Sequence, residues 1–139
     1  MFARLVLAIL VLSGAATGAV AQAQPASKST VSASAPTPDD RARQWLVLVD
    51  DKNYAQSWSE AGKVFQNREK TDAWAAKANT ERAPLGAVAS RDLKSIDLSR
   101  SDTAIVRYDT VFAHKAAAVE TVTLAFENGG WAVTDYSVN

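Results

Sequence analysis

The strongest fold signal in this chain is the stretch from Val122 to Val133, VTLAFENGGWAV. Up to Phe126, and again from Trp131, apolar side chains alternate with small or polar ones, which is typical of strands that bury one face. Asn128-Gly129 lies between the two halves, and both residues tolerate the positive φ angles that a type I′ turn requires. The stretch therefore predicts a β-hairpin in which Phe126 lies opposite Trp131.

Two further segments upstream of this hairpin have strand character. Val88 to Leu98 predicts a strand with a bulge, because Leu93 and Ile96 fall on opposite faces of a regular strand. Residues 106–112, VRYDTVF, alternate cleanly between apolar and polar side chains. Together with the hairpin, these segments predict a four-stranded antiparallel sheet.

Helical periodicity occupies the part of the chain before these strands. Thr37 to Asp40, TPDD, predicts a helix start, because threonine caps, proline suits the first helical position and acids favour the positive end of the helix dipole. Three apolar stripes at helical spacing then predict about three helices. Their members are Ala42, Trp45, Leu46 and Val49; Tyr54, Trp58, Ala61 and Phe65; and Trp74 and Ala78. Helices followed by a meander predict an α+β fold, with the helices packed on one face of a curved sheet.

The N-terminus has the order of a secretory signal peptide. Arg4 precedes an apolar run from Leu5 to Leu12, and small residues follow as far as Ala23. The run is much shorter than the roughly 20 residues of a membrane-spanning helix. We expect residues 1–23 to be removed, with cleavage after Ala23 favoured over cleavage after Ala21. The expected location is the periplasm or the medium, without a membrane anchor after cleavage.

The remaining chain divides into a tether and a domain. Residues 24–37 are rich in Ser, Ala and Pro and predict a disordered tether, whereas residues 38–139 predict a single domain. The chain contains no cysteine, so neither a disulfide nor a lipid anchor on cysteine is available. It carries 15 basic and 15 acidic residues without a basic run, which argues against a nucleic-acid partner.

Four segments carry a family likeness. They are WLVLVDDKNYAQSW, RAPLGAVASRDL, FAHKAAAVETVTL and GGWAVTDYSV, in that order. In sequence and spacing they resemble the exported bacterial family named domain of unknown function 4019 (DUF4019). The last segment is also similar to the terminal strand of cone-shaped folds of the nuclear-transport-factor-2-like (NTF2-like) or cystatin-like type. The resemblance implies export and an α+β cone. NTF2-like cones host isomerases, dehydratases, hydrolases and non-catalytic modules, so the fold alone does not select an activity.

The candidate site is the polar end of the predicted sheet. Matching the apolar faces of the middle hairpin places His114 opposite Glu120, with Lys115 to Ala118 as the connecting loop. The register of the last hairpin brings Asp135 to the same end, opposite Val122. These polar groups are therefore expected at the mouth of the cone.

Two interpretations of this polar end stay open. In the favoured one, His114 and Glu120 form an ordinary solvated pair beside a turn. In the other, His114 is a general base oriented by Asp135 or Glu120. An aromatic ligand-binding wall would then lie beside it, made of Tyr108, Phe112 and Trp131.

The sequence leaves open which face of the sheet Tyr136 occupies. It has the opposite parity to Trp131, so it is turned inward by a bulge or lies on the outer face.

No familiar catalytic motif accompanies these residues. The sequence has no glycine-rich phosphate loop, no His-Glu-x-x-His, no Gly-x-Ser-x-Gly and no cysteine nucleophile. A zinc site would need several carboxylates around the single histidine, His114, which is unusual for that metal. We therefore expect neither a metal nor a cofactor.

These observations favour a non-catalytic binding or interaction module of the bacterial envelope, whose partner is a small ligand or an envelope protein. The alternative is a cone-fold enzyme that performs acid–base chemistry on a small apolar molecule, using His114 with Asp135 or Glu120. A structural envelope protein without a ligand is a third hypothesis. The outer parity of the sheet permits a homodimer through Ile105, Val111, Val119 and Ala125.

Overall fold

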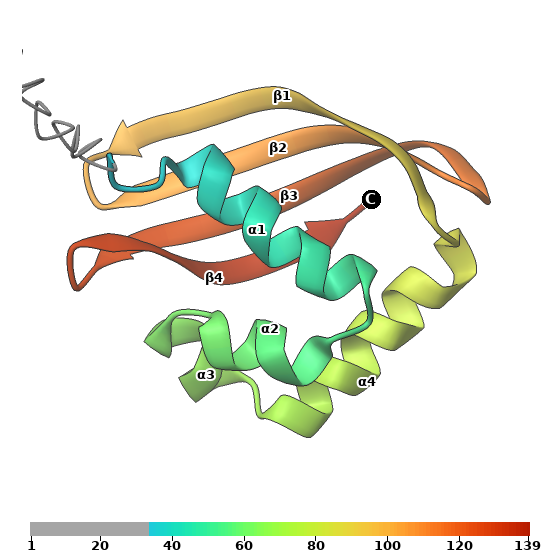
Figure 1. Cartoon of the computed structure of the whole chain (residues 1–139), viewed down its shortest axis with the longest axis horizontal. Coiled ribbons are helices and arrows are strands. Elements are labelled where there is room, and N and C mark those ends of the chain that lie inside the picture. Colours follow the sequence, from blue (N-terminus) through green and yellow to red (C-terminus); the bar gives the residue numbers. More distant parts are fainter. Residues whose placement is uncertain (1–33) are drawn as a thin grey trace, which may run out of the picture. The chain divides into compact units, whose positions relative to one another are not determined.

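The computed structural model describes residues 34–139 (Figure 1). The predicted signal peptide and most of the predicted tether lie outside this range. The elements, in chain order, are α1 (Pro38–Asp50), α2 (Tyr54–Glu60), α3 (Lys63–Arg68), α4 (Thr71–Arg82), a short 3₁₀ helix (Ala83–Leu85), β1 (Val88–Arg100), β2 (Thr103–Phe112), β3 (Lys115–Glu127) and β4 (Gly130–Val138). Within the described range, no helix has the length and hydropathy needed to cross a membrane.

Helix α1 begins where the TPDD segment predicts. The Thr37 hydroxyl accepts a hydrogen bond from the Asp40 backbone N–H at 3.2 Å, and the Asp40 carboxylate accepts one from the Thr37 N–H at 3.0 Å. This reciprocal capping box satisfies backbone donors that have no partner inside the helix. The predicted helix start is confirmed, and α1 buries the predicted stripe of Ala42, Trp45, Leu46 and Val49.

The second predicted stripe is divided between α2 and α3. The break falls at Ala61-Gly62, where the Gly62 N–H donates a hydrogen bond to the Val133 carbonyl oxygen at 2.7 Å. A β-carbon at Gly62 would displace the Glu127 carboxylate and lie only 3.2 Å from Cβ of Ala132, so glycine suits this close approach to β4. The apolar stripe from Tyr54 to Phe65 is thus carried by two short helices instead of one.

The sheet has the order β1-β2-β3-β4, and all its neighbouring strands are antiparallel. The predicted bulge in β1 is confirmed, because the β1–β2 register shifts between Leu93 and Ser95. In Figure 1 the helices lie on one side of the sheet, with α1 drawn across it and α4 leading into β1. The expected α+β arrangement of helices on a curved meander is confirmed.

The β3–β4 hairpin has the predicted register near its turn and departs from it further on. Phe126 pairs with Trp131, as expected. A register shift between Thr123 and Leu124 then pairs Val122 with Tyr136 instead of Asp135. Of the two positions expected for Tyr136, the bulge selects the inner one, because it turns the side chain inward, where it is buried.

The predicted register of the β2–β3 hairpin is wrong. Glu120 pairs with Tyr108, not with His114, and the turn is Ala113-His114, not Lys115 to Ala118. The N–H groups of Ala113 and His114 donate to the carbonyl oxygens of Ala87 and Leu85, at 2.8 and 2.9 Å. These bonds hold the turn against the segment that enters β1, and the four residues assigned to the loop extend β3.

Aromatic side chains dominate the core between the helices and the sheet. Trp45 lies 5.6 Å from both Trp74 and Tyr136, and Phe65 lies 5.0 Å from Trp74, measured between ring centroids. The indole N–H groups of Trp45 and Trp74 both donate to Ser57, at 2.7 and 2.9 Å. The tryptophans thus bury large rings without leaving a donor unpaired.

Candidate functional site

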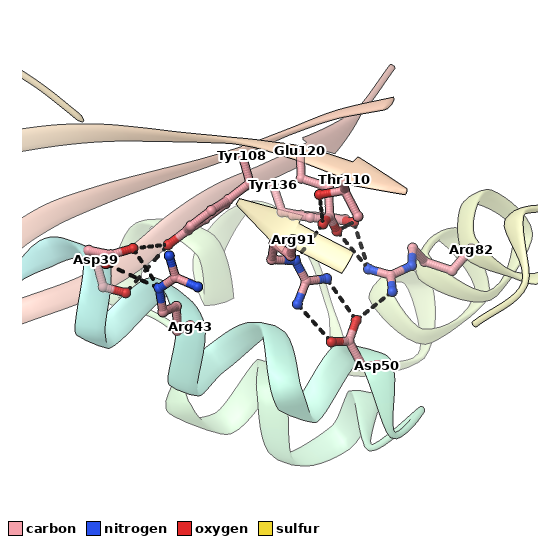
Figure 2. A network of polar contacts seen from close by, with 9 residues as sticks. All are labelled: Asp39, Arg43, Asp50, Arg82, Arg91, Tyr108, Thr110, Glu120 and Tyr136. Carbon is pink, nitrogen blue, oxygen red and sulfur yellow. Dashed lines mark hydrogen bonds and ion pairs between the residues drawn. The ribbon is translucent and has the colours of Figure 1, made fainter. Parts of the chain in front are cut away.

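A buried carboxylate interrupts the apolar inner face of the sheet (Figure 2). Glu120 follows Ala118 and precedes Val122 on β3, so the strand's alternation points its side chain toward the helices. The side chain of Glu120 is completely buried. A buried carboxylate requires several hydrogen-bond donors, and neighbouring elements supply them.

Four donors surround Glu120. Its Oε1 accepts hydrogen bonds from the Tyr136 hydroxyl at 2.7 Å and from Arg82 Nη1 at 2.9 Å. Its Oε2 accepts from Arg91 Nε and from the Thr110 hydroxyl, both at 2.7 Å. The donors come from α4, β1, β2 and β4, so this one side chain connects four elements.

Asp50, the last residue of α1, joins the same two arginines. Arg91 donates to both oxygens of Asp50, from Nη1 at 2.8 Å and from Nη2 at 3.0 Å. Arg82 Nη2 donates to Oδ1 of Asp50. Two guanidinium groups and two carboxylates therefore balance in charge. We call Asp50, Arg82, Arg91 and Glu120, with Thr110 and Tyr136, the charge cluster.

Burial and the neighbouring charges shift the pKa values of Tyr136 and Arg91. Burial, followed by the negative charge of Glu120, raises the pKa of Tyr136, so its hydroxyl stays protonated. Burial by itself would lower the pKa of Arg91, but hydrogen bonds to Asp50 and Glu120 outweigh it and raise that pKa. The arginines therefore stay charged, and the tyrosine stays a neutral donor.

A pocket of about 260 Å³ lies beside the charge cluster. Asp50 and Arg82 form its wall on the cluster side. Its other lining residues come from the end of α1, the start of α2 and the segment between α4 and β1. They are Val49, Lys52, Tyr54, Ala83, Gly86 and Ala87. We call this the cluster pocket.

Residues 41–136 match the family described as "Protein of unknown function (DUF4019)". The matched range contains every member of the charge cluster. This chain belongs to the DUF4019 family. No curated protein sequence matches the chain significantly.

Two solved structures are similar to this DUF4019 chain. A proposed calcium/calmodulin-dependent protein kinase type II association domain from Thiobacillus denitrificans is similar over 75% of this chain and 94% of that chain, with a TM-score of 0.54 and 14% identity. A proposed NTF2-like transpeptidase from Campylobacter jejuni is similar over 70% of this chain and 96% of that chain, with a TM-score of 0.49 and 20% identity. At such low identity, the first likeness shows the fold alone, and it confirms the expected α+β cone.

The DUF4019 fold separates the three polar residues proposed from the sequence. Glu120 lies in the charge cluster. Asp135 pairs with Thr123, on the face opposite to that of Tyr136, and accepts a hydrogen bond from Arg68 Nη2 at 2.7 Å. His114 is exposed in the β2–β3 turn.

Its imidazole nevertheless lies close to the cluster pocket. A β-carbon built on Gly86, which lines that pocket, would be only 2.7 Å from Cδ2 of His114. His114 therefore lies beside Gly86 of the pocket lining, and Glu120 is bonded to Arg82 of the same lining. Asp135 contacts Arg68 instead.

The aromatic wall expected from the sequence is also divided. Tyr108 is buried beside α1, and its hydroxyl donates to the Asp39 carboxylate at 2.6 Å. Phe112 lies under the Arg82 guanidinium, 4.9 Å from its ring centroid. Trp131 packs against Phe126 near the β3–β4 turn, with the ring centroids 5.3 Å apart. None of the three lines the cluster pocket.

Sequence reasoning did not propose five of the cluster residues, which are Asp50, Arg82, Arg91, Thr110 and Tyr136. A signal for Arg82 exists, because it continues the stripe of Trp74 and Ala78 by one more step of four residues. Thr110 likewise occupies an inward position between Tyr108 and Phe112. A charged or polar residue at a core position is the signal that should have marked the cluster.

Proposed function

We propose that this DUF4019 protein is an exported, non-catalytic module that binds a small ligand in the cluster pocket. One observation carries the proposal: a pocket of about 260 Å³ has part of a buried charge cluster as its wall. Binding sites for small molecules typically combine an apolar lining with a few fixed polar groups. Val49, Ala83 and Ala87 supply the lining, and Asp50 and Arg82 supply the fixed groups.

The way the cluster is bonded supports binding without chemistry. A general base must be free to accept a proton from the bound molecule. Both oxygens of Glu120, and both of Asp50, already accept hydrogen bonds from arginines. The cluster thus favours a rigid wall, and a pre-formed wall lowers the ordering cost of binding.

A larger hollow of about 390 Å³ is less suited to this role. It is lined by residues 116–119 and by a pair of exposed side chains, Lys94 and Asp109, which bind each other at 2.7 Å. Exposed ion pairs of this kind contribute little binding energy because water screens them. The cluster pocket is therefore the better candidate.

The second candidate is the cone-fold enzyme, now reduced to His114 as the acid–base group. The observation in its favour is the contact between the His114 imidazole and Gly86 at the pocket. Neither Asp135, which faces Arg68, nor Glu120, which is held by four donors, is free to orient that imidazole.

A ligand screen by NMR tests the binding proposal. We would record amide chemical shifts of the purified protein against a set of small molecules that includes anionic, neutral and cationic members. Saturable shifts at Lys52, Tyr54, Gly86 and Ala87 are expected from at least one member. If no member shifts these amides, or if the shifts lie at the larger hollow, the proposed function is wrong.

The same samples separate the two candidates. A binding module leaves the ligand signals unchanged over days, and His114→Gln leaves the affinity unchanged. An enzyme produces new product signals, and these disappear in His114→Gln although the ligand still binds. Product formation that depends on His114 would therefore replace the binding module with the enzyme.

A further inference from the structure

We propose that the ligand of the cluster pocket is a short-chain organic monocarboxylate, an inference that rests on the proposed function of this pocket. The hydrogen-bonding groups and the charges that line the pocket support this choice of ligand. Three donors of the lining have no hydrogen-bond partner among the described residues, whereas its one carboxylate is already bonded.

The first donor is the Nε–H of Arg82. The Arg82 side chain is only 7% exposed, and its Nε is buried with no hydrogen-bond partner among the described residues. Its Nη groups are bound to Glu120, Tyr136 and Asp50, so the guanidinium cannot rotate to pair Nε elsewhere. A buried donor left without an acceptor is costly. Because other protein atoms cover Nε, a ligand oxygen would reach it only after a small shift of the pocket wall.

The second donor is the hydroxyl of Tyr54, at the start of α2. Tyr54 is nearly buried in the pocket wall, and within residues 34–139 its hydroxyl makes no hydrogen bond. Burial raises the pKa of Tyr54, with the charge of Arg82 opposing the rise, so the group remains an O–H donor at neutral pH.

The third donor is the ammonium group of Lys52, in the turn between α1 and α2. Lys52 has a φ of 60°, in the left-handed region that a side chain rarely adopts. Two backbone hydrogen bonds hold the turn, from the Lys52 N–H to Val49 and from the Asn53 N–H to Leu48, at 3.1 and 2.8 Å. In the part of the chain that the structure describes, no carboxylate lies within ion-pair distance of Lys52.

The only carboxylate in the pocket lining already accepts hydrogen bonds from the protein. Asp50 is the only acidic residue that lines the pocket, and its two oxygens accept three hydrogen bonds from Arg91 and Arg82. The charge cluster is neutral, so Lys52 leaves the pocket with one positive charge. Unpaired donors, no free carboxylate and one positive charge select an anion with acceptor oxygens.

Charge and size narrow the class of anion. A carboxylate carries one negative charge and balances Lys52, whereas a phosphate dianion would leave a negative charge uncompensated. Val49, Ala83 and Ala87 offer apolar contact to a hydrocarbon chain. Because 260 Å³ is slightly below the roughly 300–1,000 Å³ of pockets for drug-sized ligands, the chain must be short.

A matched series of probes tests the charge requirement. We would titrate the purified protein with butanoate, butanamide, butylamine and inorganic phosphate at constant ionic strength, following the amides of the pocket by NMR. Butanoate is expected to shift these amides saturably and to bind about tenfold more tightly than butanamide, since one charge-assisted hydrogen bond is worth roughly that factor.

The outcomes separate this inference from the proposed function. If butanamide, butylamine or phosphate binds in the pocket as tightly as butanoate, the carboxylate inference is wrong although the pocket still binds ligands. If neither these probes nor any member of the wider screen binds there, the proposed function fails as well.

Two variants and one control test the donors. Tyr54→Phe should weaken butanoate binding by about tenfold, because it removes one donor without removing packing. Lys52→Met should weaken it by only about twofold to fivefold, because the Lys52 side chain is exposed and water screens its charge. Lys63→Met is the matched control, since Lys63 is exposed on α3 and does not line the pocket. An equal loss in the control would mean non-specific attraction of the anion and would overturn the inference.

Discussion

Glu120 shows what one residue contributes to this fold. It occupies a core position of β3, carries a charge and is reached by donors from four other elements. Removing one partner of a buried ion pair is costly because the remaining charge is left buried and uncompensated. The two arginines therefore depend on this carboxylate as much as it depends on them.

The first prediction concerns that dependence. Glu120→Gln keeps the shape of the side chain but removes its charge, and it should lower the free energy of unfolding by about 3–5 kcal/mol. Urea denaturation followed by tryptophan fluorescence measures the loss. Asp109→Asn is the control, because Asp109 is 58% exposed in its pair with Lys94, and it should cost less than about 1 kcal/mol. A loss at Glu120 as small as the control would contradict the role given to the charge cluster.

The second prediction concerns pH and the buried tyrosines. Burial raises the pKa of Tyr136 and of Tyr108, with contributions from Glu120 and Asp39 respectively. In the unfolded chain both phenols ionise near pH 10, whereas in the folded protein they stay protonated. Above about pH 10 the unfolded state therefore binds fewer protons, and stability falls as the pH rises.

Tyr136→Phe should make this alkaline decline shallower. The measurement is the urea midpoint of the variant and of the natural protein between about pH 8 and about pH 11. Below pH 10 the variant should be less stable by about 1 kcal/mol, because it lacks the hydrogen bond to Glu120. Two parallel declines would mean that Tyr136 titrates equally in both states.

At the scale of elements, the segment between α4 and β1 positions the site. Gly86 has a φ of 76°, and it lies against the β2–β3 turn and in the lining of the cluster pocket. A β-carbon there would lie 2.7 Å from Cδ2 of His114 and 3.0 Å from Cβ of Ala113. Both the backbone angle and the close approach therefore require glycine.

The third prediction compares Gly86 with a glycine that has a positive φ but no close contact. Gly129 also has a positive φ, of 80°, but a β-carbon there would meet nothing within 4 Å. Gly129→Ala should thus cost about 1 kcal/mol for the backbone conformation alone. Gly86→Ala should cost about 1–3 kcal/mol more, because the Gly86 ψ of −164° lies in a region that only glycine adopts readily and because the turn must shift to relieve the overlap. Thermal or urea unfolding gives both values, and equal losses would contradict the requirement for glycine at residue 86.

The elements also show where pattern reading succeeded. The start of α1 at Thr37-Pro38, the Asn128-Gly129 turn and the bulge in β1 all depend on neighbours in sequence, and all three were predicted. The β2–β3 register failed because the run of alanines resembles a loop but forms part of β3. The position of the turn is fixed by backbone hydrogen bonds from Ala113 and His114 to residues on either side of Gly86. The sequence around the turn contains no pattern that predicts these bonds.

At the scale of the whole molecule, the predicted export concerns residues outside the structure. We expect cleavage after Ala23, so that the exported protein begins at Gln24. The mass of the intact protein recovered from the periplasm or the medium tests this directly. A mass corresponding to Gln22 at the N-terminus would select the alternative cleavage after Ala21, and an uncleaved mass would contradict the prediction of a removed signal peptide.

The homodimer also stays a prediction at this scale. Val111 and Val119 lie on the face of the sheet opposite to that of Tyr108 and Glu120, as their parity implied. Sedimentation of the purified protein would show whether a second copy covers them.

Local sequence was sufficient for the helix starts, for the succession of helices and strands and for the turn between β3 and β4. Each of these depends on dihedral preferences, capping and side-chain periodicity over a few residues. The charge cluster was beyond its reach, since Asp50, Arg82, Arg91, Glu120 and Tyr136 lie on five different elements. Their meeting depends on the bulge in β4 and on the place of the β2–β3 turn, which are set by packing between distant segments. A buried charge is stable only where such packing brings its partners, so the site belongs to the tertiary structure.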